Sequence, residues 1–300
     1  MTENAIGWRS PEATPELTAL IHDVREGRAA LYAALADLDA NQTDALLRTL
    51  VVGDAAPACE PPLGLDQPID SLCEQALVAR GPFDQGPVRT MLRERARMHL
   101  HLSRSTFALH TSQDLLTLWD EATCSEPIIR EFIDEPRWRT AEDGVPFTGA
   151  KLAAIFGTKD LTPGDETADP ASIPQLVEEV IAFASRQDLP PVVIAFGMSY
   201  LVFRIHPFKD GNGHTLRMLC CGLMHDAGYD EHTLLTYLDL LRGRHFEMCQ
   251  LSRAVTLGKA TTEEHIAFHL NVLLDAQQKV LTMLSNTRRR TRAAHIMRHK

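Results

Sequence analysis

The residues best suited to chemistry lie in one short stretch, 205–217, which reads IHPFKDGNGHTLR. His206 carries an imidazole that can act as a general base. Asp210 is a short carboxylate of the kind that binds a hard cation such as Mg²⁺. Arg217 can bind phosphate oxygens with both arms of its guanidinium. The stretch therefore combines a base, a cation ligand and a phosphate ligand.

A glycine-bounded turn sits inside this stretch. Gly211, Asn212 and Gly213 allow close approach of the backbone to a ligand, with N–H groups turned outward. We expect a helix to begin at this point, which places its positive end at the same spot. His214 and Arg217 are three residues apart and so share nearly one helix face. The spacing lacks the further carboxylates and terminal Glu of a calcium loop, so it favours a site for Mg²⁺-bound nucleotide phosphates.

Two apolar segments must position this stretch. Pro190 and Pro191 open a nearly all-apolar run that predicts a buried helix ending at Ile205, and residues 216–227 predict a second helix closed by Gly228. Helical spacing of apolar residues predicts further helices elsewhere. They cover 15–38, 43–52, 69–80, 88–103, 113–121, 173–186, 233–241, 246–257 and 264–284.

The region 124–172 has a different texture, rich in proline and glycine. Residues 145–147 and 155–156 are short β-like pieces within it, so a small hairpin or extended flap is expected there and strand nowhere else. The predicted class is mostly α.

Composition limits the kinds of partner. The chain has 300 residues and a formal net charge of −10, which argues against a general nucleic-acid binder. Its C-terminal end is nevertheless basic. That end could contact nucleic acid, an acidic partner or a secretion apparatus, or could simply be a solvated helix end.

Compartment can be predicted from cysteine usage and from the apolar runs. The six cysteines include no C-x-x-C pair, which indicates reduced thiols in a reducing compartment. The N-terminus shows no signal pattern, and the longest apolar run, 189–203, is too short to span a membrane. We expect a cytoplasmic protein without membrane contact, or an effector secreted without a cleavable signal.

The stretch HPFKDGNGHTLR resembles the signature H-x-F-x-[D/E]-G-N-G-R-x-x-R of the Fic/Doc family. It matches seven of the eight named positions, and His214 stands in place of the first arginine. The looser resemblance extends over about 111–284. It suggests an N-terminal helical region over 1–110, a Fic domain over 111–285 and a basic tail over 286–300.

The resemblance implies a Fic-type helical bundle core with a short β-hairpin flap. It also implies transfer of AMP, or another nucleotide-derived phosphate moiety, from a Mg²⁺-bound nucleotide such as ATP to a Ser, Thr or Tyr hydroxyl of a target protein. His206 would be the base and Asp210 would hold Mg²⁺. Gly211, Asn212, Gly213, Arg217 and the residue at the first-arginine position, His214, would face the phosphates. Flap residues would bind the target backbone by strand addition; they are Gly157, Thr158, Lys159, Asp160 and Leu161.

His214 leaves alternatives open, because a histidine is shorter than an arginine and mostly neutral at pH 7. A slower adenylyltransferase, an enzyme with another donor, a kinase-type transfer and a non-catalytic binding or toxin module all fit. Many Fic proteins also carry an inhibitory helix whose Glu pairs with the second arginine. Glu26 and Glu74 are the two weak candidates for that Glu.

Overall fold

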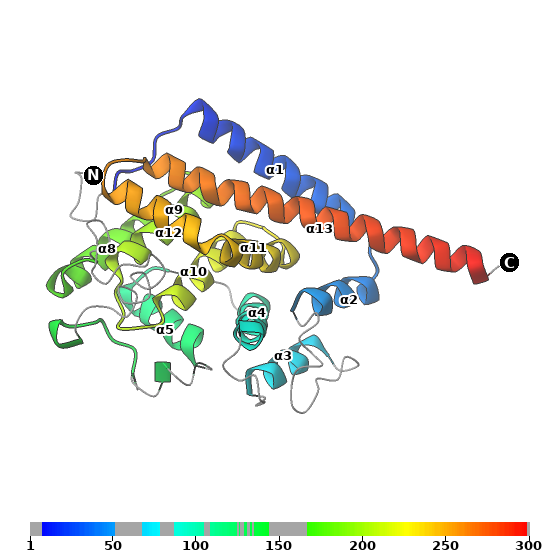
Figure 1. The fold of residues 1–300 in the computed structure, drawn as a ribbon, viewed down its shortest axis with the longest axis horizontal. Coiled ribbons are helices and arrows are strands. Elements are labelled where there is room, and N and C mark those ends of the chain that lie inside the picture. The colour runs from blue at the N-terminus through cyan, green and yellow to red at the C-terminus, as the bar shows by residue number, and fades with distance from the viewer. Residues whose placement is uncertain are drawn as a thin grey trace. The chain divides into compact units, whose positions relative to one another are not determined.

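The computed structural model describes residues 8–51, 68–78, 87–104, 109–124, 126, 129–130, 133, 135–143 and 167–298. These residues are mostly α-helical, as predicted, and contain no strand. The expected hairpin, including the flap residues 157–161, lies outside the described residues. The chain forms two compact units, which are described separately (Figure 1).

The first unit consists of residues 1–14, 101–227 and 244–268. Its helices are α5 (Ser112–Thr123), α8 (Ile173–Ala184), α9 (Pro191–Ile205), α10 (Asn212–Asp226) and α12 (His245–Thr256), with the ends of α4 and α13. Two 3₁₀ turns, η2 (Ala141–Asp143) and η3 (Pro170–Ser172), also belong to it.

Helix α9 is the core of this unit. All of its residues except Pro191 and Phe203 are buried, which is why its sequence is apolar on every side. It packs against α8 and α10, and α10 packs in turn against α5. The start of α5 is fixed by a capping box between Thr111 and Asp114. The helices on both sides of the 206–211 loop are therefore anchored in the same core.

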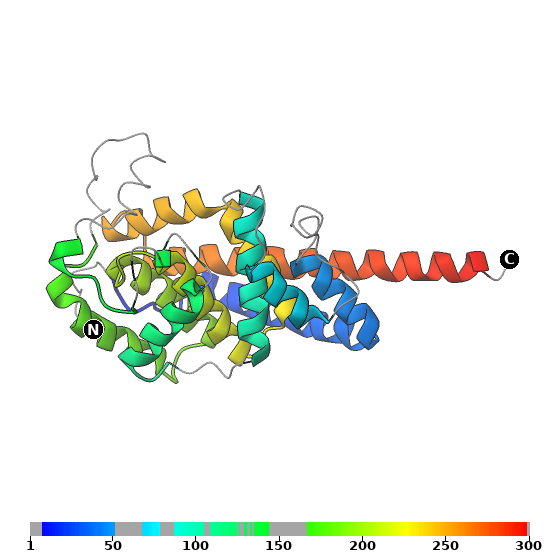
Figure 2. The same cartoon turned by 90° about the horizontal axis from the view of Figure 1, so that it is seen from below.

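The second unit consists of residues 15–100, 228–243 and 269–300. It contains α1 (Pro15–Ala36), α2 (Ala40–Val51), α3 (Ile69–Val78), most of α4 (Pro87–Arg104), α11 (Glu231–Gly243) and the larger part of α13 (Thr262–Arg298). Helix α1 runs alongside α13 in both views (Figures 1 and 2), where Gln277 donates to the carbonyl of Val24 at 3.0 Å.

Ion pairs join α4 to α11 within this unit. Arg95 binds Asp239 through two hydrogen bonds of 2.5 and 2.8 Å, and Arg242 pairs with Glu94. His99, also on α4, contacts Glu231 and, at 2.9 Å, Asp70 of α3. The 1–110 boundary predicted from the sequence stays a prediction, while residues 15–100 pack with the later helices α11 and α13.

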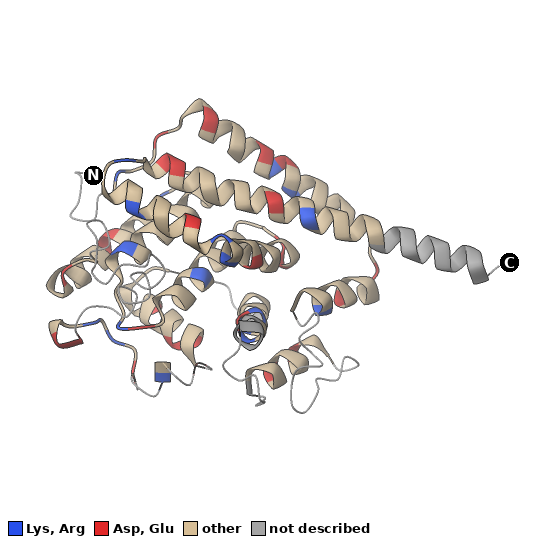
Figure 3. Ribbon diagram, viewed as in Figure 1, with Lys and Arg blue, Asp and Glu red and all other residues tan. Residues whose placement is uncertain are grey.

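Acidic and basic side chains are interspersed along the described helices (Figure 3). The side chains of residues 287–300, which carry the predicted basic tail, lie outside the described part of the chain. Among the helices that the structure describes, none combines the length and apolar character needed to cross a bilayer.

Candidate active site

The candidate base, His206, terminates α9 in an unusual backbone conformation. Its N–H still donates to the carbonyl of Val202 at 3.0 Å, but its φ of 51° and ψ of 60° are left-handed. It is the only non-glycine residue with positive φ in the described part of the chain. Such a conformation is strained for a residue with a Cβ. The chain turns sharply at His206 because α9 is locked in the core and Pro207 cannot continue the helix.

The imidazole of His206 is 4% exposed. Burial lowers its pKa to about 4, and the positive charges of Arg139 and Arg204 act in the same direction, while a hydrogen bond to the backbone of Phe203 opposes them. At neutral pH the ring is therefore uncharged, which is the form that can accept a proton.

Phe208 anchors the loop that follows. Its ring lies between two indoles, with centroid distances of 5.6 Å to Trp119 and 5.3 Å to Trp138. The side-chain amide of Asn212 closes the loop: its Oδ1 accepts from the Phe208 N–H at 3.0 Å and its Nδ2 donates to the Phe208 carbonyl at 2.7 Å. Asn212 is 5% exposed, so its side chain holds the loop from within. Its predicted contact with phosphate stays a prediction.

Asp210 and Gly211 form the tip of the loop. The indole N–H of Trp119 donates to the Asp210 carbonyl at 2.8 Å, and the Gly211 N–H donates to Oδ1 of Asp210 at 2.7 Å. Gly211 has a φ of 82°, and a Cβ there would lie 2.6 Å from Cγ2 of Thr123. Only glycine fits this position. The carboxylate of Asp210 stays partly exposed, as a cation ligand requires.

Helix α10 begins at Asn212 and carries the remaining predicted site residues in its first turns. Thr215 fixes this start, because its N–H and its hydroxyl both donate to the Gly211 carbonyl at 3.0 Å. Gly213 is exposed, while His214 and Arg217 are half-buried. A Cβ on Gly213 would lie 3.2 Å from Nη1 of Arg217, so this guanidinium lies back over the first turn. Gly213 and Arg217 thus lie close together at the start of α10.

The guanidinium of Arg217 is surrounded by protein atoms on the side that faces α10. Burial lowers its pKa to about 10, and the nearby Cys221 and Glu126 oppose that shift. The guanidinium is still a cation at neutral pH. A positive charge therefore lies one turn behind the N-terminus of α10, where the helix dipole is also positive.

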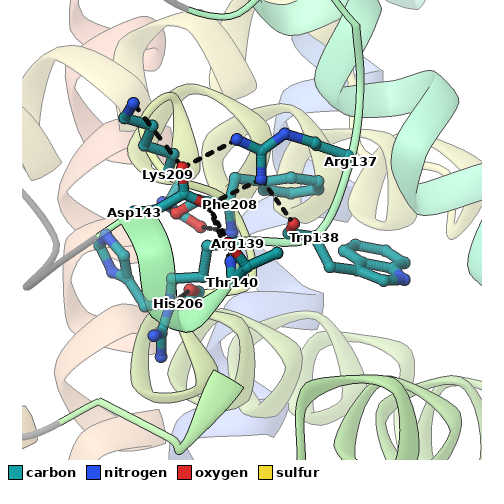
Figure 4. Close-up of polar contacts among 9 residues, drawn as sticks. Arg137, Trp138, Arg139, Thr140, Asp143, His206, Phe208 and Lys209 are labelled. Atoms are coloured by element: carbon teal, nitrogen blue, oxygen red, sulfur yellow. Dashed lines mark hydrogen bonds and ion pairs between the residues drawn. The ribbon is translucent and has the colours of Figure 1, made fainter. Parts of the chain in front are cut away.

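Residues 137–143 form a second layer against the loop, and the sequence motif gave no hint of it (Figure 4). Asp143 accepts two hydrogen bonds from Arg137 at 2.7 and 2.8 Å and lies 3.7 Å from Nζ of Lys209 in the motif. The bonds from Arg137 hold the pKa of this carboxyl well below its usual range. Arg139 bonds to the backbone at the end of α9. The available signal was Trp138 between two arginines, a large aromatic residue in an otherwise polar stretch.

Several predicted residues cannot be placed against this loop. Gly157, Thr158, Lys159, Asp160 and Leu161 lie outside the described residues. Glu26 and Glu74 are exposed residues of α1 and α3 in the second unit, and their inhibitory role stays a prediction.

The fold and the site define a class: a helical protein whose central loop, between two buried helices, carries a buried histidine, a partly exposed aspartate and the start of a helix. Comparison with known families agrees, because residues 162–224 match the model of the Fic/DOC family. This range contains α8, α9 and the whole motif. The resemblance to the Fic/DOC family predicted from the sequence is therefore confirmed over this segment.

Two solved structures resemble the chain. A Fic family protein from Desulfovibrio desulfuricans is 19% identical, with a TM-score of 0.60 over 92% of this chain and 77% of that one. A Fic domain containing signaling protein from Bacteroides thetaiotaomicron is 15% identical, with a TM-score of 0.43 over 88% of this chain and 98% of that one. The first likeness supports the helical fold. No curated protein matches the sequence.

Proposed function

We propose that the chain is a Fic-type protein nucleotidyltransferase, which moves AMP, or another nucleotide-derived phosphate moiety, from a Mg²⁺-bound nucleotide to a hydroxyl of a target protein. One observation carries the proposal. A neutral, buried histidine and the first turn of α10 are fixed at opposite ends of a single loop, which is braced by Phe208 and Asn212. Phosphoryl-type transfer depends mainly on such positioning and on charge stabilisation.

The base in this proposal is His206. A target Ser, Thr or Tyr hydroxyl must lose its proton as its oxygen attacks the α-phosphorus of the nucleotide. The imidazole is neutral at pH 7, since burial lowers its pKa to about 4, and so it has a lone pair available. The ring would take the hydroxyl proton while the pyrophosphate leaves.

The anion-binding part of the site is the start of α10. The N-terminus of an α-helix attracts anions through its dipole and its outward N–H groups, so it can bind phosphate oxygens. Gly213, which has no side chain and is exposed, keeps the backbone accessible there. Arg217 supplies a full positive charge one turn behind and would bind the terminal phosphates.

The residues at the loop tip fit a magnesium ion that arrives with the nucleotide. Mg²⁺ in nucleotide sites is commonly held by one or two carboxylates together with phosphate oxygens. Asp210 offers one partly exposed carboxylate, and the described residues contain no cluster of three or more His, Cys, Asp or Glu that could hold a metal alone. When bound, the ion would neutralise charge on the phosphates.

His214 favours a second candidate function. The resemblance calls for an arginine at this position, and a histidine there weakens the attraction for the phosphates. The alternative is a binding or toxin module of the Fic type that has lost catalysis. The substitution His214→Arg separates the two, because it should strengthen nucleotide binding in either case but increase transfer only in an enzyme.

The test is a labelling assay with matched histidine variants. The purified chain is incubated with Mg²⁺, cell lysate and each α-³²P-labelled nucleotide, with γ-³²P-ATP in parallel. We expect α-label on protein, lost in His206→Ala and retained in His22→Ala, which removes an exposed histidine of α1. Label from γ-³²P-ATP alone would indicate kinase-type transfer. The absence of label from every donor would refute transferase activity and favour the binding module.

A further inference from the structure

Arg139 is a buried arginine that belongs to no part of the motif. Its exposed fraction is 4%, and it precedes His206 by 67 residues in the sequence. It belongs to the segment 137–143 that packs against the motif loop (Figure 4). Its Nε donates to the His206 carbonyl at 2.7 Å, and its Nη2 donates to the Ile205 carbonyl at 3.4 Å. Its own backbone N–H donates to the Pro207 carbonyl at 2.8 Å. One residue thus binds three consecutive carbonyls at the turn between α9 and the motif loop.

Those carbonyls need partners. The last carbonyls of an α-helix find no N–H within the helix, and Pro207 supplies no N–H to continue the pattern. The same guanidinium also bonds to the hydroxyl of Thr167, at 3.0 Å, and to the carbonyl of Ala168. It therefore ties the end of α9 to the chain that leads into α8. These contacts surround the left-handed backbone of His206 and oppose its relaxation to an ordinary conformation.

Arg139 also places a charge near the imidazole. The atoms that accept hydrogen bonds from the Arg139 guanidinium are carbonyl oxygens and one hydroxyl, all of them neutral. None of these bonds therefore cancels its positive charge with a carboxylate. Asp169 and Asp143 act on it only over a longer range. Arg139 and Arg204 are the charged groups that act on His206, and both disfavour the protonated ring.

We propose that Arg139 is a positioning residue for the transfer reaction: it holds His206 in its left-handed conformation and orients the imidazole as a base, while its charge adds to the effect of burial in disfavouring protonation of the ring. The catalytic role of His206 rests on the proposed function, whereas the conformational and charge effects do not. A purely structural arginine would stabilise the first unit without changing the state of the His206 ring.

The test combines NMR with kinetics on the full chain. Histidine is labelled with ¹³C at Cα and at Cε1, and His206→Gln identifies the two His206 signals by their loss. In the natural protein the Cε1 signal should stay that of a neutral ring between pH 5 and 8. In Arg139→Met we expect the midpoint of its titration to rise by about one pH unit, because a nearby like charge is lost. We also expect its Cα shift to move, because the backbone is released.

The kinetic readout tests positioning. Arg139→Met should lower the kcat of labelling by about 100-fold, the scale expected for a misplaced reacting group, while the KM for the nucleotide stays within about twofold. Arg139→Lys keeps the charge but has no fork to bind several carbonyls. It should keep the low midpoint and still move the Cα shift and lower kcat.

Arg137→Met is the matched control. Arg137 is in the same segment, but its side chain bonds to Asp143 and the Trp138 carbonyl and not to the end of α9. It should leave the His206 signals unchanged. A natural-like His206 midpoint and Cα shift in any folded Arg139 variant overturns the proposal, and so does failure of both variants to fold while Arg137→Met folds. If the natural chain labels nothing, the transferase proposal fails, and the NMR results still decide the role of Arg139.

Discussion

Gly211→Ala tests whether the motif loop is held as tightly as the structure indicates. Gly211 has a φ of 82°, a conformation that costs a residue with a Cβ about 1–2 kcal/mol. The added methyl would also lie 2.6 Å from Cγ2 of Thr123 and 2.7 Å from Nε1 of Trp119. Overpacking of a filled site typically costs about 1–3 kcal/mol. We therefore expect the free energy of unfolding of the first unit to fall by about 2–5 kcal/mol.

Gly213→Ala is the matched control, two residues further along the chain in the first turn of α10. Gly213 is helical and exposed, and the methyl would meet the guanidinium of Arg217, the end of a flexible side chain, with Nη1 nearest at 3.2 Å. Alanine is favoured over glycine in a helix by up to about 1 kcal/mol. The stability of this variant should therefore stay within about 1 kcal/mol of the natural chain.

The assay is urea unfolding followed by tryptophan fluorescence. All three tryptophans of the chain, Trp8, Trp119 and Trp138, lie in the first unit, so the signal reports that unit alone. Thr123→Ser in the Gly211→Ala background removes the clashing methyl and should restore about 1 kcal/mol. Equal stability of the two alanine variants would refute the close packing of the loop against α5.

Two further predictions concern pH and have opposite signs. Burial lowers the pKa of His265 to about 3, so the stability that depends on its neutral ring is present above pH 6.5 and is lost as the pH falls toward 3. Between pH 7 and pH 4.5 the free energy of unfolding of the first unit should fall by about 2–3 kcal/mol because of this residue. Urea unfolding of His265→Phe, followed by fluorescence, should not show that fall. Burial alone would lower the pKa of His99, but hydrogen bonds and charge from Glu231 and Asp70 outweigh it and raise the pKa, so this contribution is present below pH 6.5 and is lost as the pH rises through the raised value. Thermal unfolding followed by circular dichroism should show that His99→Gln is more destabilised at pH 6 than at pH 9. An equal effect at both pH values would contradict ion pairing of a protonated His99 with Glu231 and Asp70.

Much of the fold could be predicted from the sequence because apolar periodicity is a local signal. The helix expected to end at Ile205 does end there, and it is buried as its uniform apolar character implied. The helix after the motif begins at Asn212, earlier than the apolar pattern starts, because a glycine turn and Thr215 fix its first turn without apolar residues. A periodicity argument cannot detect such polar starts.

The surroundings of the site could not be predicted, because they come from distant parts of the chain. Trp119 is 91 residues from the carbonyl that it binds, and Arg139 is 67 residues from His206. Neither spacing follows any local pattern. Trp119 reads in the sequence as an ordinary apolar residue of an amphipathic helix, and its indole N–H gains a role only once α5 packs against α10.

The structure divides the motif residues into two groups that the sequence does not distinguish. Phe208, Gly211 and Asn212 face inward, and their contacts are with the loop itself, with α5 and with Trp138. Asp210 and Gly213 keep exposed surface at the loop tip and at the start of α10. A substitution in the first group should loosen the loop and lower both stability and nucleotide binding. A substitution in the second group should lower nucleotide binding and leave stability unchanged. The two effects are separable in one experiment, because two of the three tryptophans that report stability, Trp119 and Trp138, pack directly against Phe208 of the inward group. Asn212 is the informative case. If Asn212→Ala loses stability in proportion to its loss of nucleotide binding, the Asn212 amide serves to hold the loop. If the variant loses nucleotide binding alone, the amide contacts the phosphate.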